Sequence, residues 1–190
     1  MRKPTHVYQL NRLLKTGLIA SICFLDVACI NHNAQTRGIQ NPSSALHIQV
    51  TTHLGDNANF VKGDELQLLL SLNRSSYCLL LYQDAQQHLW QLFPNRMRAS
   101  AKLPAGDYQQ FPNENDGIKI TVGPPFGQEK VMLFASDKPL PDLPFVKSVN
   151  GMRLLRGTLA SVEQQVSEQM NSQSAQLAQA TSVINTAELP

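Results

Sequence analysis

The chain has 190 residues, of which 42% are hydrophobic, and its formal charge is +2. The apolar fraction is sufficient for a buried core, and the length suits one domain with extensions. The basic excess is confined to the N-terminus, because residues 1–28 hold four basic side chains and one acidic side chain, which leaves −1 for residues 29–190. This distribution lacks the basic surface typical of nucleic-acid binding, so we expect no nucleic-acid partner.

The first 28 residues have the layout of a secretory signal peptide. Polar residues with four positive charges precede a run of ten mostly apolar residues, 16–25. That run is shorter than the roughly 20 residues that a membrane-spanning helix needs, and a basic stretch before a short apolar stretch is typical of a secretory signal. The following residues, Asp26-Val27-Ala28-Cys29, resemble a bacterial lipobox, although Asp26 stands where that pattern prefers leucine. The resemblance implies cleavage before Cys29 and acylation of its sulfur and new amino group.

Two other interpretations of the N-terminus stay open. The chain is an ordinary secreted protein if it is cut near Ala28 without acylation, or a cytosolic protein if the N-terminal segment is a buried helix. The cysteines bear on this choice, because Cys23 lies inside the predicted signal and Cys78 lies in an apolar strand, where a buried, unreactive thiol is expected. A Cys29–Cys78 disulfide is the alternative if Cys29 is not acylated.

Two segments lack the apolar periodicity of folded elements. Residues 29–45 are rich in Asn, Gln, Ser, Gly and Pro, and they predict a flexible tether. Residues 172–190 are mostly Ser, Gln, Ala and Thr with one charged residue, and they predict a polar tail that is either a frayed helical extension or disordered.

Between them, residues 46–148 have the pattern of an antiparallel β-sandwich of about seven strands. Leu66, Leu68, Leu70 and Leu72 alternate with other residues, which indicates a strand with one buried face. Residues 77–82 (YCLLLY) are continuously apolar, which suggests a central strand that pairs with residues 88–93 in a hairpin. Turn residues separate the segments, as in sandwiches. The remaining strands are expected at 46–54, with Leu54 facing inward, and at 107–111, 118–122 and 130–136.

A change of period predicts one C-terminal amphipathic helix over residues 149–171. Residues 139–145, with three prolines, should form an extended strap before it. Met152, Leu155, Leu159, Val162, Val166 and Met170 then follow at spacings of three and four. Asn150 could cap its start. We expect the apolar stripe of this helix to pack on the sandwich, and the alternative is that it binds a partner.

The sequence has no motif that indicates catalysis. It lacks the GxSxG, Walker and HExxH patterns, so we expect no enzyme activity and no cofactor. His47 and His53 are about 20 Å apart on one strand face, too far for one metal ion, although His88 could in principle join either. The turn at residues 113–116 (NEND) could bind calcium weakly, but it lacks regular ligand spacing, so we expect a solvated turn there. The aromatic residues that could contact a ligand or partner are Trp90 and Tyr108.

The chain from about residue 46 to residue 156 resembles an uncharacterised bacterial domain of unknown function. That domain occurs in envelope lipoproteins and is appended to caspase-like peptidases and protein kinases. The matching features are Gly63-Asp64, Tyr77, Leu92-Phe93-Pro94-Asn95, Ala105-Gly106, Pro125-Phe126-Gly127-Gln128-Glu129, Ala135-Ser136 and Pro139-Leu140. The resemblance implies a β-sandwich-like accessory or ligand-binding module with no established activity, in which these residues have structural roles.

Together these patterns predict a lipoprotein anchored in the outer membrane through acylated Cys29 and facing the periplasm. Its expected role is a non-catalytic protein-interaction module for an envelope protein, such as an accessory component of a secretion or envelope-assembly complex. Partner binding would use an edge strand or the C-terminal helix. The alternative is binding of a small ligand, such as a glycan or peptidoglycan fragment, in an aromatic-lined cleft. The oligomeric state is not predicted.

Overall fold

The computed structural model describes residues 45–114 and 116–188. They belong to the second of the two units into which contacts divide the chain, residues 41–190. The predicted signal peptide, Cys29 and the tether up to residue 44 lie outside the described residues, so they stay predictions. Within the described ranges, no helix has both the length and the apolar character needed to cross a membrane.

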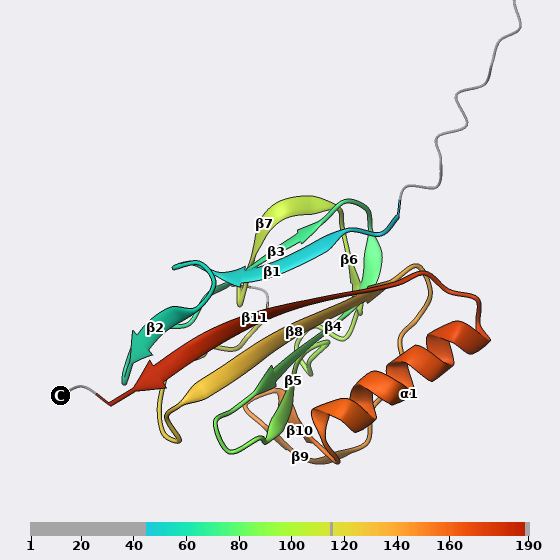
Figure 1. The fold of residues 1–190 in the computed structure, drawn as a ribbon. Helices are drawn as coiled ribbons and strands as arrows, with labels where there is room; N and C mark the ends of the chain where they lie inside the picture. Colours follow the sequence, from blue (N-terminus) through green and yellow to red (C-terminus); the bar gives the residue numbers. More distant parts are fainter. Residues whose placement is uncertain (1–44, 115, 189–190) are drawn as a thin grey trace, which may run out of the picture. The chain divides into compact units, whose positions relative to one another are not determined.

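The described residues form eleven strands and one helix, which confirms the mostly-β prediction (Figure 1). A three-stranded sheet has the order β1 (Ile48–Thr52), β3 (Leu68–Leu72), β7 (Gly106–Phe111). The larger sheet has the order β2-β11-β8-β4-β5-β10-β9, and β6 pairs with β4. Its strands are β2 (Ala58–Val61), β4 (Ser76–Gln83), β5 (Leu89–Phe93), β6 (Lys102–Leu103), β8 (Gln128–Ser136), β9 (Phe145–Val149), β10 (Met152–Leu155) and β11 (Leu177–Ala187). Among the strand pairs of the described residues, β2–β11 is the only parallel one.

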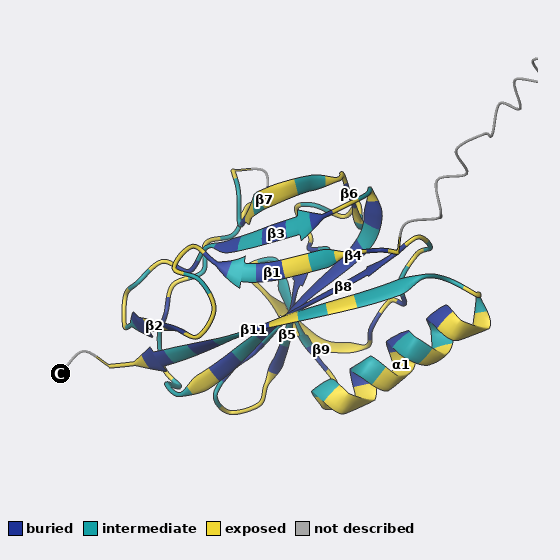
Figure 2. Ribbon diagram, turned by 45° about the horizontal axis from the view of Figure 1, so that its top comes forward, coloured by how far each residue is buried: buried dark blue, intermediate teal, exposed yellow. Residues whose placement is uncertain are grey.

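Two hydrophobic cores cover the two faces of the larger sheet. The first core joins the two sheets, with Leu70 on the small sheet and Leu80 and Leu133 on the large one. The second core joins the opposite face to the helix α1 (Leu159–Ser172). The predicted alternation from Leu66 to Leu72 is confirmed, since all four leucines are buried. Figure 2 shows β4 and β8 mostly buried and β7 more exposed.

The helix packs on the sheet through its apolar stripe, as predicted. Val162, Val166 and Met170 are buried against residues of β4 and β8, including Leu81 and Phe134. The start of the helix was predicted wrongly, because Thr158 rather than Asn150 is its N-cap. The Thr158 side chain accepts a hydrogen bond from the Ser161 backbone N–H, which satisfies one of the unpaired donors of the first turn.

The first part of the predicted helix, together with the end of the strap, is a β-hairpin. β9 and β10 pair in antiparallel fashion around Asn150 and Gly151, which have φ angles of 50° and 86°. Two consecutive positive φ angles are the requirement of a two-residue type I′ hairpin turn, and Asn-Gly is its preferred sequence. Met152 and Leu155 therefore belong to a strand, although their spacing continues the helical stripe.

The prediction of a polar tail at residues 172–190 is wrong, and this is the largest difference between the predicted and the observed fold. β11, within this segment, lies between β8 and β2 in the large sheet (Figure 1). It pairs with the whole of β8, from Leu177 opposite Ser136 to Asn185 opposite Gln128. Because backbone pairing needs no apolar side chain, a segment rich in small polar residues can occupy a central strand when its side chains find partners. Ser182, for example, donates a hydrogen bond to Asp56 at 2.8 Å.

Two smaller expectations also fail. Residues 118–122 are not a strand, and they contribute only an isolated bridge between Thr121 and Glu65. Leu54 was expected to face inward but is 59% exposed, because β1 has already ended at Thr52. Six of the seven expected strands are present. Five further strands were not predicted and bring the described chain to eleven: β2, β6, β9, β10 and β11.

Candidate ligand-binding cleft

A cleft of about 540 Å³ lies beside the first core. One side is formed by Tyr82, Trp90, Glu129 and Met152, and the other side is formed by the segment 119–125. The end of the β9–β10 hairpin, at Val149 and Asn150, completes the lining, together with Leu66, Asp84 and Leu92. A volume of this size is typical of small-molecule sites.

Three neighbouring strands bring the principal side chains together. In the sheet order β8-β4-β5, Tyr82 on β4 is paired with Trp90 on β5 and with Val131 on β8. Glu129 lies two residues before Val131 and therefore points to the same face of the sheet. This arrangement places the phenol of Tyr82 between the indole of Trp90 and the carboxyl group of Glu129 on one face of the sheet, although up to 47 residues separate them in the chain.

Glu129 is the more deeply buried of the two acidic residues that line this cleft. Its residue is 3% exposed, and its two carboxyl oxygens accept hydrogen bonds from Tyr82 Oη at 2.5 Å and Thr186 Oγ1 at 3.1 Å. Burial raises the pKa of the Glu129 carboxyl, because desolvation disfavours the charged form, while the two hydrogen bonds act in the opposite direction. The charge of Asp84 adds to the increase in pKa.

Tyr82 is fixed as a hydrogen-bond donor in this pair. Burial raises the pKa of its phenol above the ordinary value of 10.0, and the adjacent Glu129 carboxyl raises it further. The phenol therefore keeps its proton and donates a hydrogen bond to Glu129. This bond gives the cleft a positioned carboxyl group.

Asp84 shapes the hairpin turn at the cleft. Its Oδ1 accepts the backbone N–H groups of Gln86 and His88 at 2.9 and 2.8 Å. Its Oδ2 lies 3.0 Å from His88 Nδ1. Gln87 in the same turn has a φ of 67°, so the side-chain bonds of Asp84 help to hold an otherwise unfavourable backbone. Asp84 thus stabilises the turn and also places a second carboxyl group near Glu129.

The opposite wall is fixed by backbone hydrogen bonds rather than by a strand. The N–H of Leu66 donates to the carbonyl of Ile120 at 3.0 Å, and the N–H of Val122 donates to Asp64 at 2.9 Å. The N–H of Gly63 donates to Val122 at 2.9 Å. Gly63 has a φ of 93°, which favours glycine at this turn. The wall segment is thereby attached to the chain that leads into β3.

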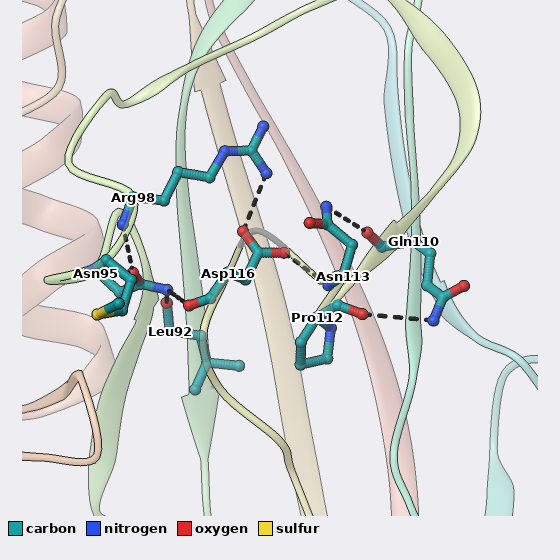
Figure 3. Close-up of polar contacts among 8 residues, drawn as sticks. Leu92, Asn95, Arg98, Gln110, Pro112, Asn113 and Asp116 are labelled. Carbon is teal, nitrogen blue, oxygen red and sulfur yellow. Dashed lines mark hydrogen bonds and ion pairs between the residues drawn. The ribbon is translucent and has the colours of Figure 1, made fainter.

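A buried polar cluster anchors the loop that precedes this wall (Figure 3). Asn95 Nδ2 donates to the carbonyls of Leu92 and Asp116 at 3.2 and 3.3 Å. Asp116, which is fully buried, accepts from Arg98 Nη1 at 3.0 Å and from the Asn113 N–H at 2.8 Å. The turn at residues 113–116 was expected to be solvated, but Asp116 holds it against the end of β5.

The cleft and its walls lie largely within a segment that resembles other proteins. Residues 59–139 match the model of a family described as a domain of unknown function (DUF4384). The DUF4384 match agrees with the resemblance drawn from the sequence, and it includes Tyr82, Asp84, Trp90 and Glu129. Thr186, on β11, lies outside the DUF4384 segment yet bonds to Glu129 within it. No curated protein and no solved structure matches the chain.

The structure separates the two aromatic residues chosen from the sequence. Trp90 lines the cleft within the DUF4384 segment. Tyr108 lies on β7 of the small sheet, is 67% exposed, and is not among the lining residues. Sequence reasoning missed Tyr82 and Glu129. A signal for Glu129 was present, because it precedes Val131, Leu133 and Ala135 in the inward phase of an alternating strand.

The remaining candidates have local structural roles. Cys78 is a free thiol with no exposed surface, and burial raises its pKa to about 12, which agrees with the expected unreactive thiol. The His53 ring contacts Phe60, with 5.7 Å between ring centroids. Across residues 45–114 and 116–188, no three His, Cys, Asp or Glu side chains gather closely enough to hold a metal ion.

Proposed function

We propose that this chain is a non-catalytic ligand-binding module that takes a small envelope ligand, such as a glycan or peptidoglycan fragment, into the cleft at Trp90. The observation that carries the proposal is the cleft itself. Its volume of about 540 Å³ is in the range of small-ligand sites, and its lining combines apolar and aromatic side chains with convergent polar groups. A flat sheet face would have favoured protein interaction instead.

The proposal also includes the cellular compartment in which the chain acts. The signal-like residues 1–28 and the lipobox-like sequence ending at Cys29 support a lipoprotein that is held at the outer membrane and faces the periplasm. In that position a binding module would meet peptidoglycan fragments. Mass spectrometry of the mature protein should find an acylated Cys29 as its first residue, and a free Cys29 still attached to residues 1–28 would contradict this part of the proposal.

The binding proposal is tested by calorimetric titration of the chain with soluble peptidoglycan fragments and chitin-type oligosaccharides. Trp90→Leu should abolish saturable binding, because it removes the largest ring of the cleft. Tyr108→Leu is the matched control and should bind as the wild type does. Since Trp90 also packs on the first core, Val149→Ser at the exposed rim gives a second variant that should weaken binding without affecting folding. Equal binding by wild type, Trp90→Leu and Val149→Ser would contradict the proposal.

A protein contact at β9 is the second candidate function. All five residues of β9 are exposed, including Phe145, Val146 and Val149, and among the described strands it pairs only with β10. An edge strand with a free row of backbone groups can accept a strand from another protein. A pull-down from detergent-solubilised envelopes should capture a specific partner, and Val146→Asp should release it. No specific partner, or a partner retained by Val146→Asp, would count against this role.

A further inference from the structure

Within the described part of the chain, no cation pairs with Glu129, whereas Asp84, the other acidic group of the cleft, lies 3.0 Å from His88 Nδ1. Among the described residues, five ion pairs are present, and none includes Glu129. Buried carboxylates are ordinarily paired with a cation or protonated, because an isolated buried charge is costly. Lys119 also lines the cleft, but its Nζ lies 2.7 Å from Glu65 and its side chain is 68% exposed. Glu129 therefore lines the cleft without a positive partner from the described chain.

Glu129 retains the capacity to accept further hydrogen bonds. A carboxylate has about four lone-pair sites, and the structure assigns one donor to each oxygen, Tyr82 Oη and Thr186 Oγ1. A donor that enters from the cleft can bond to Glu129 without displacing either partner. These two donors also keep the carboxyl group in a fixed orientation, which reduces the ordering that binding requires.

No cation of the described residues lies over the aromatic rings of the cleft. Elsewhere in the described chain, Arg98 lies over Phe93, Lys102 over Tyr77 and Arg153 over Phe145. No such contact involves Trp90 or Tyr82 within the described residues, although both line the cleft with Glu129. Tryptophan is the ring that attracts a cation most strongly. Ile120, Val122 and Met152 provide apolar surface suited to an alkyl chain beside these rings.

We propose that the cleft recognises a primary ammonium group on an alkyl chain. The ammonium lies at Glu129 and against Trp90, and the alkyl chain lies among the apolar side chains of Ile120, Val122 and Met152. This chemistry is available from a free alkyl diamine or from the side chain of a diamino acid in a peptide. The inference rests on the proposed ligand-binding function, and it assigns that function to an amine-bearing part of a ligand rather than to a sugar ring.

Three probes and the fluorescence of Trp90, which is the sole tryptophan of the chain, test this inference. The probes are N-acetyl-lysine methylamide, 1,5-diaminopentane, and N-acetyl-norleucine methylamide, which lacks the amino group. At least one of the two amines should give a saturable change, and the norleucine derivative should bind roughly tenfold more weakly or worse, because it leaves the buried carboxylate unpaired. Binding of both amines indicates that a free diamine suffices, and binding of the lysine derivative alone indicates an amino-acid source.

Glu129→Gln is the decisive variant, because glutamine keeps the shape of the side chain and one acceptor oxygen, places an NH2 donor at the other position, and carries no charge. It should lose roughly tenfold or more in amine affinity, whereas the exposed Glu168→Gln on α1 should bind as the wild type does. Lowering the pH should weaken amine binding by the wild type as Glu129 takes up a proton, and should have a smaller effect on Glu129→Gln. Equal affinities of wild type and Glu129→Gln, or of the lysine and norleucine probes, would overturn the inference.

The outcome also separates this inference from the function on which it rests. If the amines fail to bind while a peptidoglycan fragment or oligosaccharide still binds at Trp90, the ammonium assignment is wrong and the ligand-binding function stands. If neither the amines nor those fragments bind, both proposals fail.

Discussion

The phenol of Tyr82 donates a hydrogen bond to the carboxyl group of Glu129 across the neighbouring strands β4 and β8, with 2.5 Å between the two oxygens. Because β11 supplies the second donor, Thr186, the pair links three adjacent strands of the large sheet on the face that carries the cleft. This relationship connects the stability of the fold to the chemistry of the proposed site, and the first two predictions concern it.

Replacing Tyr82 with phenylalanine should lower the free energy of unfolding at pH 8 by about 1–3 kcal/mol, since a buried carboxylate loses a hydrogen-bond donor. The loss should be smaller at pH 4, where more of Glu129 carries a proton. Urea denaturation at both pH values measures the effect. Tyr77→Phe on the same strand is the control, because the Tyr77 hydroxyl makes no hydrogen bond within the described residues. A loss in Tyr82→Phe no larger than in Tyr77→Phe would contradict the assigned bond.

The raised pKa of Glu129 predicts a pH-dependent difference between wild type and Glu129→Gln. A carboxyl group whose pKa is higher in the folded state binds its proton more tightly there. Its contribution therefore stabilises the protein below the ordinary pKa of 4.5 and is lost as the pH rises through the raised value. The groups that face Glu129 are Tyr82, Asp84 and Thr186, and of these Asp84 is the other carboxyl group.

Urea denaturation between pH 4 and pH 8 should thus show the stability of the wild type falling relative to Glu129→Gln as the pH rises. The exposed Glu168→Gln should keep a constant difference from the wild type over the same range. If the wild type instead gained stability relative to Glu129→Gln with rising pH, the pKa of Glu129 would be lowered in the folded state, and the prediction would be wrong.

The second core predicts a strong effect of truncation on the helix. Met170 has no exposed surface and packs in the core between α1 and the large sheet. Met170→Ala should lower the free energy of unfolding by about 2–5 kcal/mol, because it removes buried apolar surface and leaves a cavity. Gln165→Ala on the exposed side of α1 should change it by less than about 0.5 kcal/mol. Similar losses in the two variants would indicate that the helix does not pack as described.

Hydrogen exchange should distinguish a central β11 from a polar tail. The amides of β11 bond to β8 on one side and to β2 on part of the other, so peptides that cover residues 178–186 should be among the slowest to exchange. Peptides that cover the exposed edge strand β9 should exchange faster. Rapid exchange throughout β11, at the rate of an unstructured peptide, would contradict its place in the sheet.

The parts of the fold that the sequence predicted are those in which one local pattern controls burial. Leu66 to Leu72 alternate because one face of β3 is buried, and β4 is continuously apolar because both its faces are covered. The order of the hairpin β4–β5 also follows from short-range spacing. These signals need no knowledge of distant residues.

The missed elements depend on distant partners or on competing signals. β11 has few large apolar residues, and its buried Ser182 and Thr186 are satisfied by Asp56 and Glu129, which no local pattern reveals. The β9–β10 hairpin was recognisable from Asn150-Gly151, but the spacing of Met152 and Leu155 continued the helical stripe. For the cleft, Trp90 was identified because it is a conspicuous residue type. The convergence of Tyr82 and Glu129 on it depends on the order of the strands, which the sequence does not state.

The most direct test of the central claim is a ¹H–¹⁵N spectrum of the chain titrated with a soluble peptidoglycan fragment. The single tryptophan gives one indole N–H resonance, which reports on the cleft alone. The account predicts that this resonance shifts saturably together with the amides of Val149 and Met152, while the amide of Tyr108 stays in place. A fragment that binds with the Trp90 indole unmoved, or a titration in which no resonance moves, would contradict it.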